Sequence, residues 1–290
     1  MIVHPPDIYF FPRAGLLDAG FLFLRKHPGL KGAVVTYVVY TLDHGEAEDR
    51  SSLAARTLSA SILEADAVVG NSRYVTETIH QSYGIPARTI HSGIDRRYFY
   101  PPSPGRIGQE DPHSTFTVLY AGSFQARKRV DFVIREAVRW PEVCFRLVGS
   151  GEEMEKCKDL SHHLGCQNVT FLGHLAPALL GEEMRKADVF LFPSLEEGHP
   201  QVLGQATACG LPCLAMNTYH PDYVVNEKTG FLVSTDGELS EKLNLLLTHP
   251  DLRQSMSRTA VEHSQQFKWE QIIGQWEGVF EEVTSRRLEG

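Results

Sequence analysis

Short apolar runs alternate with amphipathic segments along the chain, a pattern typical of an α/β protein built on parallel sheets. The clearest strand of the first third is predicted at residues 33–40 (AVVTYVVY), which are rich in β-branched and aromatic side chains. Shorter strands are predicted at 8–11, 67–70 and 89–91. Helices are predicted at 14–27, from Ser51 or Ser52 to about 64, and from the cap residue Ser72 to 83.

The second half of the chain repeats the alternation. Strands are predicted at 117–120, 144–148, 169–172, 189–192 and 213–216, and helices at 130–140, 152–164, 178–187 and 201–209. Three more predicted helices, at 238–247, 250–265 and 269–287, form a helical tail. Residues 100–114 are rich in proline, glycine and polar side chains without periodicity, which indicates a linker. We therefore expect two Rossmann-like domains, 1–105 and 106–290, with the tail in the second.

Composition supports this two-domain picture and excludes some functions. The length of 290 residues fits two domains of roughly 100–150 residues each. A hydrophobic fraction of 42% and a charged fraction of 22% are ordinary for a globular protein. The formal net charge of −8 provides no general basic surface, so we expect no nucleic-acid partner.

The N-terminal region and the cysteines suggest a compartment. Met1 is followed by Ile, Val, His and two prolines, which is unlike a signal peptide. The apolar stretch 14–24 is interrupted by Asp18 and is far shorter than the roughly 20 residues of a membrane span. We expect no transmembrane segment, while peripheral membrane contact stays open. Five cysteines without scaffold spacing indicate a reduced, cytoplasmic setting.

The stretch 189–216 (VFLFPSLEEGHPQVLGQATACGLPCLAM) carries the strongest functional pattern. It predicts a strand, a polar loop, a helix that begins after Pro200 and a second strand. Open parallel sheets bind ligands at the carboxyl ends of their strands, and a helix N-terminus favours an anion such as a phosphate. Glu197 in the loop and Gln205 on the helix are candidates for hydrogen bonds to the hydroxyls of a ligand. The alternatives are that Glu197 is a solvated acid of the loop and that Gln205 is an exposed residue of the helix.

A second candidate site follows the strand at 117–120. There, Gly122 and a short loop lead to three consecutive cations, Arg127, Lys128 and Arg129. Cationic side chains can neutralise a departing diphosphate, although a solvated basic turn is the alternative. Turns with glycine also follow the next two strands, as Gly149-Ser150-Gly151 and Gly173-His174-Leu175, but glycines close many such turns for steric reasons alone.

No metal or cofactor is expected. The sequence contains no Asp-x-Asp motif, and Cys209 with Cys213 lacks further ligands at zinc spacing. His44 lies in an acidic loop after the predicted strand 33–40, where a surface position is favoured over catalysis.

Taken together, these segments resemble the retaining GT-B glycosyltransferases of family four. The resemblance to the donor-binding domain covers about 117–233, and residues 63–99 resemble the end of the acceptor domain. The matching segments are YAGSFQARKRVDFVI, FRLVGSGEEMEKC, VTFLGHL, ADVFLFPSLEEGHPQVLGQATACGLPCLA, EKTGFLV and LEADAVVGNSRYVTETIHQSYGIPARTIHSGIDRRYF.

The resemblance implies roles for individual residues. The Glu-x7-Glu motif of the family falls on Glu197, which would contact the donor sugar, and on Gln205, which would hold the ribose hydroxyls. Lys128 matches the phosphate-binding lysine. Lys128 and Glu197 are thus the expected catalytic residues. The expected donor-binding residues are Gly122, Ser123, Arg127, Gly149, Gly151, His174, Leu175, Gly198, His199, Pro200, Gln201 and Gln205.

The chain departs from the family pattern at several positions. Gln205 replaces a glutamate, and Ser123 replaces an arginine, so Arg127 or Arg129 would have to supply the second cation. Residues 218–222 (TYHPD) replace a Gly-Gly-x-Pro-Glu turn. The N-terminal domain is expected to be incomplete, because the first strands and the cleft histidine of the family have no clear counterpart.

The resemblance therefore implies a GT-B glycosyltransferase that transfers a sugar from a nucleotide-sugar donor to an unknown acceptor, with retention of configuration and without a metal. The alternative is a non-catalytic nucleotide-sugar-binding subunit, or a degenerate transferase that needs a partner chain. A GT-B epimerase or phosphorylase is a weaker alternative. An uncovered sheet edge in the incomplete domain would favour a homo- or hetero-oligomer.

Overall fold

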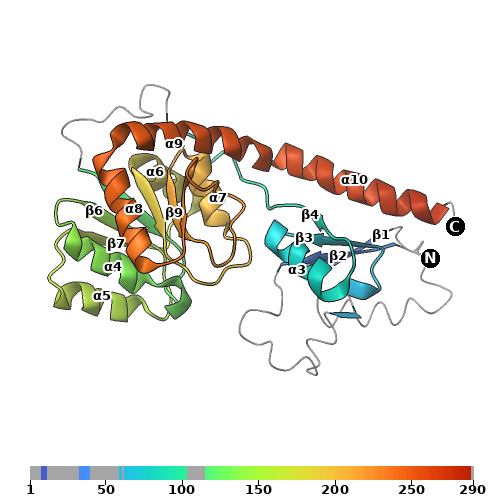
Figure 1. Cartoon of the computed structure of the whole chain (residues 1–290), viewed down its shortest axis with the longest axis horizontal. Coiled ribbons are helices and arrows are strands. Elements are labelled where there is room, and N and C mark those ends of the chain that lie inside the picture. The colour runs from blue at the N-terminus through green and yellow to red at the C-terminus, as the bar shows by residue number, and fades with distance from the viewer. Residues whose placement is uncertain (1–7, 12–32, 40–58, 61, 103–114, 289–290) are drawn as a thin grey trace. The chain divides into compact units, whose positions relative to one another are not determined.

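The computed structural model describes residues 8–11, 33–39, 59–60, 62–102 and 115–288. The chain divides into two compact units (Figure 1). Unit 1 comprises Met1–Ser92 and Trp269–Gly290, and unit 2 comprises Gly93–Lys268. The predicted helix 14–27, the loop around His44 and most of the predicted linker lie outside the described residues.

Unit 2 is built on a six-stranded parallel sheet with the order β10-β9-β8-β5-β6-β7. In chain order this is the strand arrangement of a Rossmann fold, with the reversal between β5 and β8. The strands are β5 (Thr117–Ala121), β6 (Cys144–Val148), β7 (Val169–Gly173), β8 (Val189–Phe192), β9 (Cys213–Met216) and β10 (Gly230–Val233). Every residue of β5, β8 and β9 is buried, as expected for central strands covered on both faces.

Helices cover both faces of this sheet (Figure 1). One face carries α4 (Val130–Arg139), α5 (Met154–His163) and α8 (Asp236–Thr248). The other carries α6 (Pro177–Lys186), α7 (Gln201–Ala208) and α9 (Pro250–His263). The predicted helix from residue 152 begins two residues later, while the other strands and helices of this unit lie close to their predicted positions.

Unit 1 contains a four-stranded parallel sheet in the order β1-β2-β3-β4. Its strands are β1 (Ile8–Phe11), β2 (Ala33–Val38), β3 (Ala67–Gly70) and β4 (Arg88–Thr89). Helix α3 (Arg73–Tyr83) begins at the predicted cap Ser72, whose hydroxyl accepts from the Val75 amide at 3.3 Å. Val38 and Val68 face α3, so one face of the sheet is covered by this helix.

The last helix, α10 (Trp269–Leu288), covers the other face of the unit 1 sheet. Ile272, Val279 and Val283 are buried against Val35 and Val69. The sequence analysis placed this helix in the second domain, whereas the contacts group it with unit 1. The reason is its apolar stripe, which fits the alternate residues that β2 and β3 present on one face.

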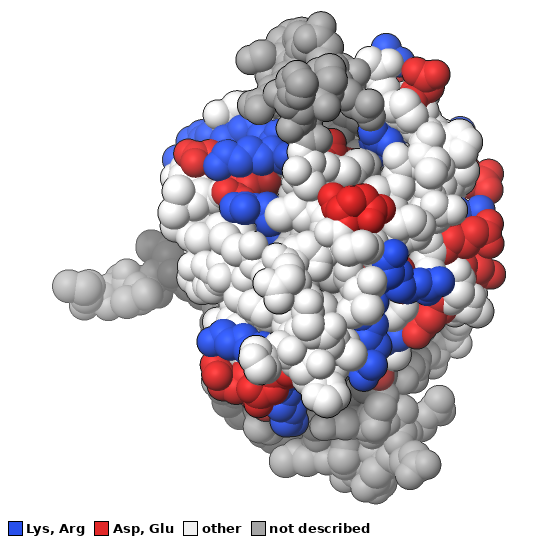
Figure 2. Space-filling model, turned by 90° about the vertical axis from the view of Figure 1, so that its left-hand side faces the viewer, with Lys and Arg blue, Asp and Glu red and all other residues white. Residues whose placement is uncertain are grey.

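The surface carries mixed charge. On the face shown in Figure 2, blue Lys and Arg atoms alternate with red Asp and Glu atoms around uncharged surface. On α5, Lys156 pairs with Glu153 at 2.6 Å and Lys158 pairs with Glu155 at 2.8 Å. Within the described ranges, no helix combines the length and the apolar character that crossing a membrane requires.

Candidate functional site

The candidate residues gather where the sheet of unit 2 reverses its strand order. Strands β5 and β8 are neighbours, but their successors β6 and β9 lie on opposite sides of this pair. The loops after β5 and β8 therefore diverge and leave a crevice at the carboxyl ends of the strands. The first loop carries Lys128 and the second carries Glu197, so two candidates that lie far apart in the sequence come together here.

The glycines after β6 bring its loop close to the loop after β5. Gly149 has φ +135, and a Cβ there would lie 1.8 Å from the carbonyl oxygen of Gly122. Gly151 has φ +155, and a Cβ would lie 2.4 Å from the carbonyl oxygen of Phe124. The amide of Phe124 donates to the carbonyl of Ser150 at 2.8 Å. Only glycine fits these backbone positions, so Gly149 and Gly151 shape the crevice sterically.

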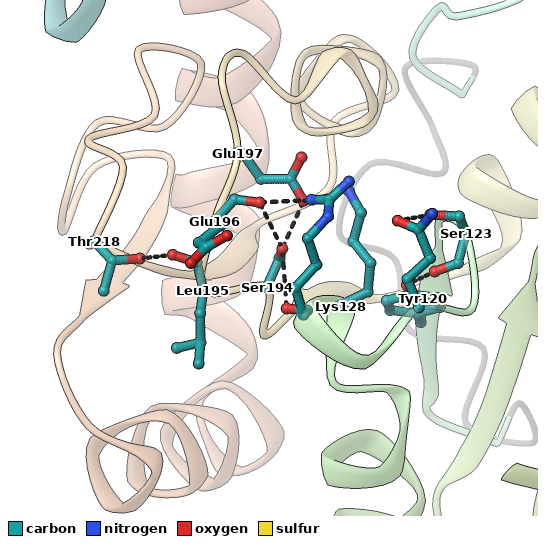
Figure 3. Close-up of polar contacts among 10 residues, drawn as sticks. Tyr120, Ser123, Lys128, Ser194, Leu195, Glu196, Glu197 and Thr218 are labelled. Carbon is teal, nitrogen blue, oxygen red and sulfur yellow. Dashed lines mark hydrogen bonds and ion pairs between the residues drawn. The ribbon is translucent and has the colours of Figure 1, made fainter. Parts of the chain in front are cut away.

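Lys128 ends a short 3₁₀ helix and turns its side chain into unit 2. The next residue, Arg129, has a left-handed conformation at φ 54, which separates this turn from α4. The Lys128 side chain is only 10% exposed, and its ammonium lies 5.1 Å from the centre of the Phe192 ring. It donates to the Glu197 carboxylate (Figure 3). A structural ion pair therefore joins the two expected catalytic residues.

Three side chains converge on one oxygen of Glu197 (Figure 3). Lys128 donates to Oε1, the Ser194 hydroxyl donates to it at 2.5 Å, and the Arg127 guanidinium lies 3.2 Å away. The Glu197 side chain is 9% exposed, so its charge would be costly without these partners.

Burial and charge shift the pKa values of groups around this cluster. Burial holds the pKa of Lys128 below its ordinary value, although the negative charge of Glu197 opposes that shift. Burial, with the charge of Glu197 adding to it, raises the pKa of Tyr120, so this tyrosine stays neutral. Its hydroxyl donates to the carbonyl of Ser123 at 3.1 Å and thereby fixes the loop after β5.

Backbone hydrogen bonds hold the β8 loop in place. The Arg127 guanidinium donates to the carbonyl of Glu196 at 2.6 Å, and the Thr218 hydroxyl donates to the carbonyl of Leu195 at 2.6 Å. Arg129 instead forms an ion pair with Asp236. Of the two arginines that the sequence left open, Arg127 is therefore the one beside Glu197.

The other candidates lie around this cluster at different depths. Gly198 and Pro200 are buried before α7, and Gln201 is exposed as its first residue. The His199 ring packs against the Tyr223 ring at 4.2 Å between centres. Gln205 is half-buried on α7, and its side chain makes no hydrogen bond to the described residues.

His174 and Leu175 follow β7, which lies two strands away from β5 in the sheet. His174 is exposed and Leu175 is half-buried. The structure brings Arg127, Lys128 and Glu197 into direct contact, while these two residues border the same edge of the sheet at a greater separation.

The sequence analysis missed Ser194 and Thr218. Ser194 is fully buried and contacts the Glu197 carboxylate, and Thr218 ties the loop after β9 to the loop after β8. The Ser-x-x-Glu spacing of Ser194 and Glu197 was an available signal, since a serine three residues away from a glutamate can reach it in a tight loop. Thr218 gave no comparable signal.

Comparison with known proteins identifies the chain at the level of a family. The sequence model of the family "Glycosyl transferases group 1" matches residues 107–263, which is more than half of the chain. The chain belongs to this family. The match includes every candidate residue from Gly122 to Gln205, so the cluster lies inside the part of the chain that defines group 1 glycosyltransferases.

Relatives and solved structures agree with this assignment. A D-inositol 3-phosphate glycosyltransferase of Saccharomonospora viridis is 31% identical over 72% of this chain and 53% of its own length. Sucrose-phosphate synthase of Thermosynechococcus elongatus superposes with a TM-score of 0.80 at 21% identity, covering 97% of this chain and 74% of that one. HepE of Anabaena, solved with UDP and glucose, superposes with a TM-score of 0.76 at 19% identity, covering 95% of this chain and 78% of that one.

These similarities establish the fold. This group 1 glycosyltransferase chain has the α/β GT-B fold expected from the sequence, with parallel sheets in two Rossmann-like parts and a C-terminal helix. The chain spans about half the length of the curated relatives it matches, 60% of one from Methanocaldococcus jannaschii and 53% of that from Saccharomonospora viridis.

Proposed function

We propose that this chain transfers a sugar from a nucleoside-diphosphate sugar to an acceptor hydroxyl, with retention of configuration and without a metal cofactor. The observation that carries the proposal is the buried contact between Lys128 and Glu197 at the strand reversal of unit 2. The ammonium of Lys128 can bind a diphosphate, and the carboxylate of Glu197 can accept a hydrogen bond from a sugar hydroxyl. Both groups lie at the ligand-binding edge of the sheet.

Lys128 stabilises the leaving group in this proposal. An ammonium has three N–H donors, of which one reaches Glu197, so two remain for the diphosphate oxygens. Arg127 supplies a second positive charge, since its guanidinium lies 3.2 Å from the same carboxylate oxygen. As the bond between the sugar carbon and the diphosphate oxygen breaks, these cations offset the charge that develops on the leaving oxygen.

Glu197 has a positioning role. Its carboxylate accepts a hydrogen bond from a hydroxyl of the donor sugar and holds the reacting carbon beside the diphosphate. The acceptor oxygen attacks from the face that the diphosphate leaves, and the departing phosphate oxygen takes the acceptor proton. This front-face course retains the configuration and requires no side chain as general base.

A second candidate is a nucleotide-sugar-binding subunit without turnover of its own. Gln205 favours it, because an amide in place of a carboxylate holds ribose hydroxyls less firmly. A Gln205→Glu variant distinguishes an impaired site from an adapted one. A large gain in donor affinity would indicate an impaired native site, whereas unchanged or weaker binding would indicate that the glutamine suits the native ligand.

The proposal is tested by incubating the purified chain with UDP-glucose, GDP-mannose and ADP-glucose, and measuring both thermal stabilisation and release of the free nucleoside diphosphate. Slow release with one donor is the expected result. Stabilisation without release would favour the binding subunit, and the absence of both for every donor would refute the proposal.

The Lys128→Ala variant tests the role of the lysine in this assay. Loss of one group that stabilises the leaving charge should lower turnover well over tenfold, by about 30- to 1,000-fold, which corresponds to about 2–4 kcal/mol. Lys156→Ala is the matched control, because Lys156 is a surface lysine that pairs with Glu153 on α5. Equal turnover in the wild type and the Lys128→Ala variant would contradict the assignment.

A further inference from the structure

The two carboxylate oxygens of Glu197 have different environments. Oε1 receives Lys128, Ser194 and Arg127, whereas no hydrogen bond from the described residues reaches Oε2. In Figure 3 one oxygen of Glu197 faces Ser194 and Lys128, and the other points away from both. The carboxylate is therefore anchored through one oxygen and open through the other.

Ser194 differs from Lys128 and Arg127 in its burial and in its other hydrogen-bond contacts. Its side chain is fully buried, and its hydroxyl also lies 3.4 Å from the carbonyl oxygens of Arg127 and Glu196. A hydroxyl in this position has no access to solvent. Lys128 and Arg127 can turn part of their donor capacity toward a bound diphosphate. The buried hydroxyl of Ser194 cannot, and its nearest acceptor is Oε1 of Glu197 at 2.5 Å.

We propose that Ser194 is a positioning residue that fixes the Glu197 carboxylate through Oε1 and leaves Oε2 as the acceptor for a hydroxyl of the donor sugar. This inference rests on the proposed function. It assigns Ser194 to recognition of the sugar rather than of the nucleotide. Without the serine, Oε1 is held only by Lys128 and Arg127, whose donors a bound diphosphate also attracts, so Oε2 is presented less firmly.

The test compares two ligands of the same protein. The donor that stabilises the wild type in the panel and its free nucleoside diphosphate are titrated calorimetrically into the wild type and the Ser194→Ala variant. We expect the variant to bind the sugar donor about tenfold more weakly, which is about 1.4 kcal/mol. Binding of the nucleoside diphosphate should stay within about twofold, which also shows that the variant is folded.

Two further variants separate positioning from general packing. Ser194→Thr keeps the hydroxyl and should recover at least part of the lost affinity for the sugar donor. Ser240→Ala is the matched control, because Ser240 is also buried and donates to a buried glutamate, Glu136, at 2.8 Å between α8 and α4. It should bind both ligands as the wild type does.

The possible results distinguish this inference from the proposed function. If the wild type binds a donor and Ser194→Ala binds both ligands normally, or loses both equally, the positioning role is wrong while the proposed function stands. If the wild type binds no member of the panel, the proposed function fails and the inference fails with it.

Discussion

At the scale of single residues, the proposed role of Lys128 depends on its charge. Burial lowers the pKa of its ammonium from the ordinary 10.5, so the proton is lost at a lower pH than on a surface lysine. Since only the charged form attracts a diphosphate, affinity for the nucleoside diphosphate should be retained near neutral pH. It should fall as the pH rises through a value below 10.5.

Two variants check this pH dependence by calorimetric titration of the nucleoside diphosphate from neutral to alkaline pH. Lys128→Arg keeps its charge throughout this range, so the alkaline loss due to the side chain should disappear. Any loss that remains comes from groups other than Lys128, including the nucleotide. Glu197→Gln should move the loss to lower pH, because the Glu197 charge supports the ammonium. An identical pH profile in all three proteins would contradict the assignment.

The sequence predicted part of this residue-scale arrangement. Lys128 and Glu197 each follow a predicted strand of a parallel sheet, and such strands expose their carboxyl ends at one edge, so proximity was foreseeable. The choice between Arg127 and Arg129 was not. Arg129 has a left-handed conformation and pairs with Asp236, and no local pattern predicts either feature for an arginine.

At the scale of elements, the strands and helices of unit 2 were predictable because its central strands are continuous apolar runs between loops with glycine or proline. The partner of α10 was not predictable. Its buried residues Ile272, Val279 and Val283 lie on one helical stripe, which shows that the helix covers an apolar surface. The stripe does not show which sheet provides that surface, because this depends on contacts far apart in the sequence.

Adjacent isoleucines of α10 test its contribution to unit 1. Ile272 is 1% exposed and packs against the sheet, whereas Ile273 is 50% exposed. Ile272→Ala should lower the free energy of unfolding of unit 1 by about 2–5 kcal/mol, since it leaves a cavity. Ile273→Ala should change it by no more than about 0.5 kcal/mol. Urea unfolding curves measure both, and equal midpoints would contradict the placement of α10.

At the scale of the whole molecule, the described residues of the candidate donor site all lie in unit 2. The loops that carry it, residues 122–129 and 193–200, lie inside Gly93–Lys268, as do Gln205 and Thr218. Unit 1 has its own sheet and its own apolar clusters. Binding of a nucleoside diphosphate should therefore be recorded mainly in unit 2, which hydrogen exchange can resolve segment by segment.

We expect the nucleoside diphosphate of the preferred donor to slow amide exchange in 122–129 and 193–200, because the anion orders both loops around Lys128. Exchange in α3 and β3 of unit 1 should stay unchanged under the same conditions, and Lys128→Ala should lose most of the protection. Protection confined to unit 1 would place the nucleotide elsewhere. Protection of the same two loops in both proteins would show that the anion binds there without the lysine.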